Sequence, residues 1–432
     1  MPVLNTPFLT DIDSRAAVKG YRDPLGIQQI WTRLGRYVVG NLTTVTTSVR
    51  DFTTHIVGFY FAEQLAEDLG PGSELATFLK WEQLCGYSRA HYNDDWVFRG
   101  TERVRRNLRE GGRVTISDDL AHQILSNQKT YGLWGLYTMP GRASGLVDAT
   151  GPRLTPAARE FVERVCLPRL SNDKRATAQQ VLSILRTRSS SVDIDSQRGP
   201  GPGIAHLLDR NLLAGERRFY REHLLYGGPE DSTQGRQRQL AELLAEERHW
   251  NAVWSPALVS DLIKAAQQNG EDWAKLVFYL ARIKTAEAVL APVAFLFSHL
   301  MGLEDKTIEF VGKRLREQWG PSLRTVDAEA FLELSVDLEQ AGTGFGPVWS
   351  DLAQHLATGA YEEFVTRTLD QNAQVMLARG GTPWIELRDG RLHIRYREEQ
   401  GPLPSREELS MIWRFPYFLD SVRAIGAELA ED

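Results

Sequence analysis

The sequence of 432 residues predicts a mainly α-helical, multi-helix protein with a small mixed module in its first half and a β-hairpin near its end. Long stretches repeat apolar residues every three or four positions, which is the period of an amphipathic helix. The alternation of apolar and polar residues that is typical of strands is confined to short segments. A hydrophobic content of 42% and a charged content of 25% are ordinary for a globular protein with sizeable cores.

Helical periodicity accounts for most of the first hundred residues. A turn at Asp23-Pro24-Leu25-Gly26 precedes an amphipathic segment at 27–39. Segments 42–60 and 74–90 also place apolar and aromatic residues at helical spacing, although the threonines of 43–47 lower the helix propensity of the first. We therefore predict three helices here, with a loop as the alternative for 43–49.

Residues 114–167 combine several local signals in a distinctive order. Ser117 is a candidate N-cap for a short helix at 118–127, and a second helix at 129–139 is expected to stop at Pro140. Residues 145–147 and 152–154 read as two short strands around the turn 148–151. Thr155-Pro156 has the cap and first-turn residues of another helix. The expected order is therefore helix, helix, hairpin, helix.

This order resembles a winged helix, and the run GLV…LTPAARE is similar to the wing and following helix of many bacterial winged-helix regulators. The resemblance implies a winged-helix-like module at about 99–170. Winged helices serve either as DNA-binding domains or as protein-binding modules, so the resemblance leaves both roles open.

A basic segment, RGTERVRRNLREGGR, lies at 99–113 and holds six arginines against two glutamates. DNA phosphates attract such a patch because binding releases counterions. A solvated helix face is the alternative. The candidate nucleic-acid-binding residues are Arg103, Arg106, Arg109 and Arg113 in this segment, with Lys129, Arg142 and Arg153 on the second helix and wing.

The clearest linker is the Ser-, Gly- and Pro-rich stretch RTRSSSVDIDSQRGPGPG at 186–203. It predicts an N-terminal region at 1–188, a linker at 189–203 and a helical domain at 204–432. Charge follows a similar division, because residues 1–190 hold 24 basic and 19 acidic side chains, whereas the remainder holds 26 and 37. An anionic ligand would therefore meet the first half.

The second half reads as successive helices that end in a hairpin. Residues 384–396 alternate apolar and polar side chains around Asp389-Gly390, a strong signal for a two-residue hairpin turn. Helices are expected at 173–187, 204–227, 236–250, 256–269, 273–290, 293–303, 306–318, 328–341, 348–356, 361–379, 407–412 and 417–429.

Cysteine usage and hydropathy favour a cytoplasmic protein. Cys85 and Cys166 are far apart and outside any CxxC pattern, which fits a reducing compartment and gives no cysteine metal site. The first fifteen residues lack the basic and apolar regions of a signal peptide. The most apolar segment, 276–303, carries charges and Pro292, so it reads as a buried helical pair rather than a membrane span.

No catalytic, cofactor or metal motif is recognised. Phosphate loops of the GxxxxGK[ST] type, HExxH and GxSxG are absent from the sequence. Glu386-Leu387-Arg388 is the nearest approach to a metal-dependent nuclease, but an arginine stands where that chemistry needs lysine. A binding component is therefore favoured over an enzyme, with a nuclease as the least favoured alternative.

At the scale of the whole chain, DPLG near the start, YGLWGLY…GLV…LTPAARE in the middle and RGGTPWIEL…WRFPYFLDSVRAI at the end resemble uncharacterised bacterial proteins encoded among anti-phage defence genes. The resemblance implies a subunit that works with partners such as a helicase, ATPase or nuclease. Together with the winged-helix-like module and the basic segment, it leads us to expect a non-catalytic DNA-sensing or scaffolding subunit of a bacterial anti-phage defence complex that contacts double-stranded DNA. The alternative is an adaptor that binds only proteins.

Overall fold

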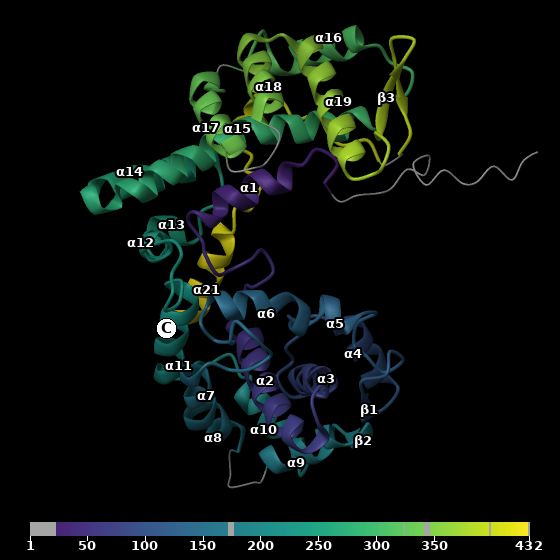
Figure 1. The fold of residues 1–432 in the computed structure, drawn as a ribbon, viewed down its shortest axis with the longest axis vertical. Coiled ribbons are helices and arrows are strands. Elements are labelled where there is room, and N and C mark those ends of the chain that lie inside the picture. The colour runs from purple at the N-terminus through teal and green to yellow at the C-terminus, as the bar shows by residue number, and fades with distance from the viewer. Residues whose placement is uncertain (1–22, 172–176, 324, 341–345, 397–398, 431–432) are drawn as a thin grey trace, which may run out of the picture. The chain divides into compact units, whose positions relative to one another are not determined.

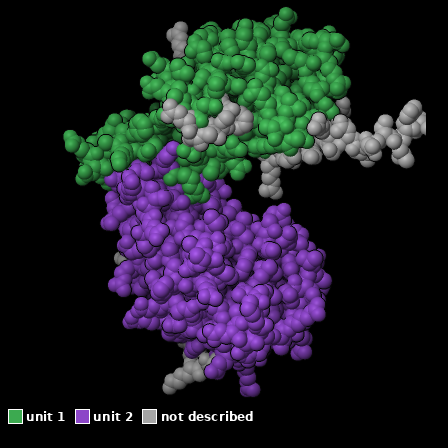
Figure 2. Space-filling view, viewed as in Figure 1, with its two compact units in different colours: residues 1–36, 251–417 green, residues 37–250, 418–432 purple. Residues whose placement is uncertain are grey.

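The computed structural model describes residues 23–171, 177–323, 325–340, 346–396 and 399–430. It divides the chain into two compact units (Figure 2), namely unit 1, with residues 1–36 and 251–417, and unit 2, with residues 37–250 and 418–432. The fold is mainly helical, as predicted. Residues 189–203, expected to be a linker between domains, lie within unit 2. The N-terminal stretch tested for a signal peptide lies outside the described residues.

Unit 2 is built around two long helices, α2 and α3, that pack against each other. Every residue of α2 from Val49 to Ala62 is buried, which is expected of a helix at the centre of a domain. Figure 1 shows α3 with α2 and several shorter helices around it. The helices of unit 2 are α2 (Val49–Leu69), α3 (Glu74–Tyr92), α4 (Thr101–Arg109), α5 (Gln128–Tyr131), α6 (Leu133–Ala143), α7 (Pro156–Phe161), α8 (Leu167–Leu170), α9 (Thr177–Arg186), α10 (Gly201–Leu207), α11 (Ala214–Tyr220), α12 (Arg236–Leu244), α13 (Glu247–Trp250) and α21 (Leu419–Leu429), with π-helical turns at Val162–Cys166 and Arg221–Leu225.

The expected helix at 118–127 is wrong. Residues Arg113–Ser117 form strand β1 instead, and 118–127 contains turns. Strand β1 pairs antiparallel with β2 (Ser189–Asp193), which lies in the stretch expected to be a linker. The side chain of Ser117 does accept a backbone N–H, that of Asp119, but in a turn rather than at a helix start.

The remainder of the winged-helix-like segment is partly as expected. The hairpin around 148–151 is reduced to one antiparallel bridge, between Val147 and Leu154. Helix α6 continues past Pro140 to Ala143 rather than stopping before the proline. The start of α7 is confirmed, because the Thr155 side chain accepts the N–H of Ala158 and Pro156 occupies the first turn.

Unit 1 is a helical array with one hairpin. The predicted hairpin at 384–396 is confirmed as β3 (Ile385–Arg388) and β4 (Arg391–Ile394) in antiparallel register. Helix α15 runs unbroken through Pro292, so the expected pair of helices is a single one. The helices of unit 1 are α1 (Ile27–Arg36), α14 (Pro256–Gln268), a short 3₁₀ turn (Glu271–Trp273), α15 (Ala274–Leu300), α16 (Ile308–Trp319), α17 (Ala328–Gln340), α18 (Gly346–Thr358), α19 (Tyr361–Ala378) and α20 (Arg406–Met411).

A long apolar helix is the feature that could have marked a membrane segment. Among the described residues, no helix is both long enough and apolar enough to cross a bilayer. Helix α15 is the longest, and it keeps Glu287 buried among its apolar residues.

Candidate nucleic-acid interface

The basic segment forms helix α4, which presents a group of exposed arginines. Gly100 precedes the helix with φ +94°, and a Cβ there would lie 2.8 Å from the carbonyl oxygen of Ile124, so glycine is required. Val104 is fully buried and fixes which side of α4 faces α3. Exposed on the outer side are Arg105, Arg106 and Arg109, which we call the arginine face.

Arg106 and Arg109 form no ion pair among the described residues. Two other exposed arginines of unit 2 are paired with a carboxylate four residues away. Arg164 pairs with Glu160 at 2.8 Å, and Arg238 pairs with Glu242 at 3.0 Å, each one helical turn apart. The arginine face therefore carries positive charge that the described neighbours do not neutralise through a direct pair.

Arg105 lies over the ring of Trp96, with its guanidinium carbon 4.6 Å from the ring centroid. Such a cation–π contact holds a long side chain in one orientation. Arg105 was not among the residues selected from the sequence. Placing Val104 inside the unit would have predicted that Arg105 and Arg106 face outward.

Two of the arginines selected from the sequence occupy different surroundings. Arg103 is half-buried and donates from Nη1 to the carbonyl oxygens of Gln123, at 2.8 Å, and Leu125, at 3.1 Å. It thereby supports the turns at 118–127. Arg113 is exposed at the start of β1, directly opposite Asp193 of β2. Its charge is therefore partly offset by a neighbouring carboxylate.

Lys129, Arg142 and Arg153 are not gathered on the arginine face. Lys129 is exposed on α5, which contacts α6 and α3. Arg142 lies in the last turn of α6 and donates from Nε to the carbonyl oxygen of Asp148 at 3.1 Å. Arg153 is exposed beside Leu154, whose N–H donates to Glu63 of α2. The turn at 146–155 is thus anchored on α2, whereas α4 packs on α3 and β1.

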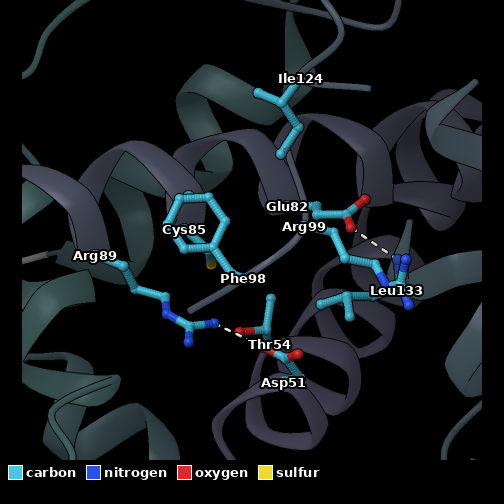
Figure 3. A pocket seen from close by; sticks show the side chains of 10 residues that line it. Asp51, Thr54, Glu82, Cys85, Arg89, Phe98, Arg99, Ile124 and Leu133 are labelled. Atoms are coloured by element: carbon cyan, nitrogen blue, oxygen red, sulfur yellow. Dashed lines mark hydrogen bonds and ion pairs between the residues drawn. The ribbon is translucent and has the colours of Figure 1, made fainter. Parts of the chain in front are cut away.

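A small cavity lies between α2, α3 and the segment that leads into α4 (Figure 3). Its volume is about 10 Å³, the space of a single water molecule. Glu82 lines it and accepts hydrogen bonds from Leu133 N and from Gln128 Nε2, both at 2.7 Å. Arg99, also in its wall, extends toward the carboxylate of Glu82.

The cavity wall is structural in character. Burial raises the pKa of Glu82 to about 7 and the pKa of the Cys85 thiol well above its usual value. A thiol with a raised pKa is a poor nucleophile. Arg89 is occupied by Asp51, at 2.6 Å, and Asp95, at 2.8 Å. The paired side chains of Glu82 and Arg89 hold neighbouring segments together. A cavity of this size leaves no room for a substrate.

The nuclease alternative requires the carboxylate of Glu386 to bind a metal ion, but this carboxylate is paired with arginines. Glu386 pairs with Arg395 at 2.7 Å and with Arg388 at 3.2 Å, and despite partial burial these cations hold its pKa below the usual range. Over the part of the chain that the structure describes, no group of three or more His, Cys, Asp or Glu could hold a metal ion.

Comparisons with known proteins add no candidate. The chain matches no protein-family model, no curated protein and no solved structure. The arginine face is therefore the candidate interface on its own geometry.

Proposed function

We propose that the protein is a non-catalytic, DNA-sensing or scaffolding subunit whose contact with nucleic acid is the arginine face of α4. The single observation that carries this proposal is that Arg106 and Arg109 are exposed, adjacent on one helix and unpaired among the described residues. Phosphates bind such groups by releasing counterions, without needing a concave pocket.

The setting within a bacterial anti-phage defence complex rests on the sequence resemblance alone. In that setting a helicase, ATPase or nuclease subunit would supply the catalytic activity. The winged-helix interpretation also stays a prediction. The proposed contact does not depend on it, because it rests on the exposure of Arg106 and Arg109 and not on the fold of residues 114–167.

The test is the affinity of the purified protein for a labelled random duplex, followed by fluorescence anisotropy at low salt. Arg106→Ala/Arg109→Ala is expected to weaken binding several-fold for every sequence tested, because phosphate contacts carry no sequence information. The matched control is Arg164→Ala/Arg238→Ala, which removes two exposed but ion-paired arginines of the same unit.

The control variant should bind like the wild type. Equal affinity of the wild type and the Arg106→Ala/Arg109→Ala variant would contradict the assignment of the arginine face. Failure of the wild type to bind any duplex or single strand would contradict the nucleic-acid proposal as a whole.

A second candidate function is a protein-only adaptor, and helix α17 of unit 1 favours it. Leu332 and Val336 are about half exposed, at 52% and 48%, and Glu329 and Glu333 of the same helix are also exposed. The spacing of these four residues places them on one helical stripe. An acidic stripe with two apolar side chains suits a basic amphipathic helix of a partner.

The adaptor is tested by co-purification with the product of a neighbouring gene after nuclease treatment. Leu332→Asp/Val336→Asp should abolish a complex held by this stripe. Leu387→Asp is the matched control, because Leu387 is 41% exposed on the hairpin of the same unit. A complex that survives the α17 changes would exclude this stripe as the docking surface.

A further inference from the structure

Trp96 lies beside the arginine face and has a fixed orientation. Its indole Nε1–H donates to Asp94 Oδ1 at 2.7 Å, and Asp94 has a left-handed backbone with φ +47°. Arg105 covers the ring from α4. The indole and the guanidinium therefore form two layers that are already assembled before any ligand arrives.

The loop that carries Trp96 is anchored on both sides. Buried Asp95 accepts Arg89 Nε at 2.8 Å and the N–H of Val97 at 3.0 Å. Arg89 Nη2 in turn donates to the carbonyl oxygen of Val97 at 3.0 Å. On the other side, the ring of Phe98 contacts the guanidinium of Arg89, at 5.2 Å. The backbone around Trp96 is thus held rigidly against α3.

Between these anchors the loop exposes apolar surface. The side chain of Val97 is 70% exposed, and Trp96 is partly exposed. An exposed valine beside an aromatic ring, next to arginines, differs from a purely ionic patch. Binding of phosphates accounts for the exposed arginines, but it does not account for an exposed aromatic ring and valine beside them.

We propose that an unpaired base stacks on the pair formed by the Trp96 indole and the Arg105 guanidinium, while Arg106 and Arg109 contact the phosphates that flank this base. The inference rests on the proposed function and specifies its ligand as single-stranded DNA. Bases stack on aromatic rings and on guanidinium planes, and a duplex keeps its base faces covered by neighbouring base pairs. The protein would accordingly prefer exposed strands or frayed ends.

The test compares two labelled single strands of equal length, an oligothymidylate and an abasic oligonucleotide with the same phosphates. Stacking contributes about 1–3 kcal/mol per base, so the wild type should prefer the thymidylate by between about fivefold and about a hundredfold. Trp96→Ala should abolish this preference and leave the affinity for the abasic strand unchanged.

Arg105→Lys separates charge from stacking, because lysine keeps the charge and lacks the guanidinium plane. It should lower the thymidylate preference and keep abasic affinity. Trp96→Phe should retain part of the preference, which guards against loss through misfolding, and circular dichroism checks each variant. Tyr131→Ala, at a tyrosine 47% exposed on α5, is the matched aromatic control and should bind like the wild type.

Equal binding of both strands by the wild type would overturn the stacking proposal while leaving phosphate contact by the arginine face intact. An unchanged preference in Trp96→Ala would overturn it as well. Binding of neither strand nor duplex would overturn the proposed function together with this inference.

Discussion

In unit 2, the buried carboxylate of Glu216 is paired with two buried arginines. This fully buried carboxylate accepts Arg50 Nη1 at 2.6 Å, Arg169 Nη1 at 2.5 Å and the N–H of Leu213 at 2.7 Å. Arg50 and Arg169 come from α2 and α8, and Glu216 from α11. Taking charges out of water is costly, so such a group stabilises only while its partners are present.

Glu216→Ala is expected to lower the free energy of unfolding by about 3–5 kcal/mol, because it leaves two buried guanidinium groups without their carboxylate. Urea denaturation followed by circular dichroism measures the loss. Glu242→Ala, which removes an exposed one-turn pair with Arg238, should change it by less than about 0.5 kcal/mol. Equal losses in the two variants would show that the buried network around Glu216 contributes no more to the free energy of unfolding than an exposed ion pair does.

Glu287 is a second buried carboxylate, within α15 of unit 1. It accepts the backbone N–H groups of Arg414 and Phe415 and, at 2.9 Å, the hydroxyl of Tyr417. Burial raises its pKa to about 7, and these hydrogen bonds only partly oppose that shift. Folding therefore favours the protonated acid near neutral pH.

A raised carboxyl pKa gives stability that is complete below the unfolded value of 4.5 and is lost as pH rises through about 7. At about 1.4 kcal/mol per unit of pKa difference, the loss is on the order of 3 kcal/mol. Glu287→Gln keeps an acceptor for the backbone N–H groups and cannot ionise. The wild type should therefore lose stability relative to this variant between about pH 5 and about pH 7.5.

Urea denaturation of both proteins across this pH range measures the effect. Parallel stability curves for the wild type and Glu287→Gln would contradict the raised pKa. Glu362→Gln is the partly exposed control in the same unit, because Arg316 lowers the pKa of Glu362 and no loss toward neutral pH is expected there.

At the scale of elements, the sequence predicts well those features that depend on neighbouring residues, and it predicts poorly the pairing of strands that are distant in the chain. The hairpin at Asp389-Gly390 and the start of α7 at Thr155-Pro156 depend on neighbouring residues only, and both are confirmed. Strand β1 depends on β2, about 75 residues away, where Val192 is buried opposite Val114. A five-residue strand whose partner is that distant has no local signature.

The cap of α7 gives the prediction at this scale. Thr155 Oγ1 accepts the N–H of Ala158 at 3.3 Å and donates to the carbonyl oxygen of Gly145 at 2.8 Å. Thr155→Ala should lower the free energy of unfolding by about 1 kcal/mol, whereas Thr155→Ser keeps the hydroxyl and should lose less. Thermal or urea unfolding of the two variants checks the difference, and equal losses would exclude the hydroxyl as the cause.

At the scale of the whole molecule, charge does not divide as the linear sequence suggested. Unit 2 holds 28 basic and 30 acidic residues, and unit 1 holds 22 and 26. Both units are therefore slightly acidic, since each combines segments from distant parts of the chain. Attraction for an anion must come from a local group of side chains rather than from the overall charge of a domain.

The candidate site was predictable to the same extent as the fold. The sequence located the basic segment, because six arginines within fifteen residues need no partner to be recognised. It could not show that Arg103 is used to hold 118–127 or that Arg105 lies over Trp96, since both contacts depend on how distant segments pack. The apolar Val104 among charged residues was a local signal for which side of this helix faces inward.

The most direct test of nucleic-acid contact by the arginine face is the salt dependence of DNA binding. The logarithm of the association constant for a random duplex is measured against the logarithm of salt concentration, for the wild type and for Arg106→Ala/Arg109→Ala. Each lost phosphate contact reduces the slope by about 1, so the variant should show a slope shallower by about 2. Identical slopes and affinities for the two proteins would contradict the account.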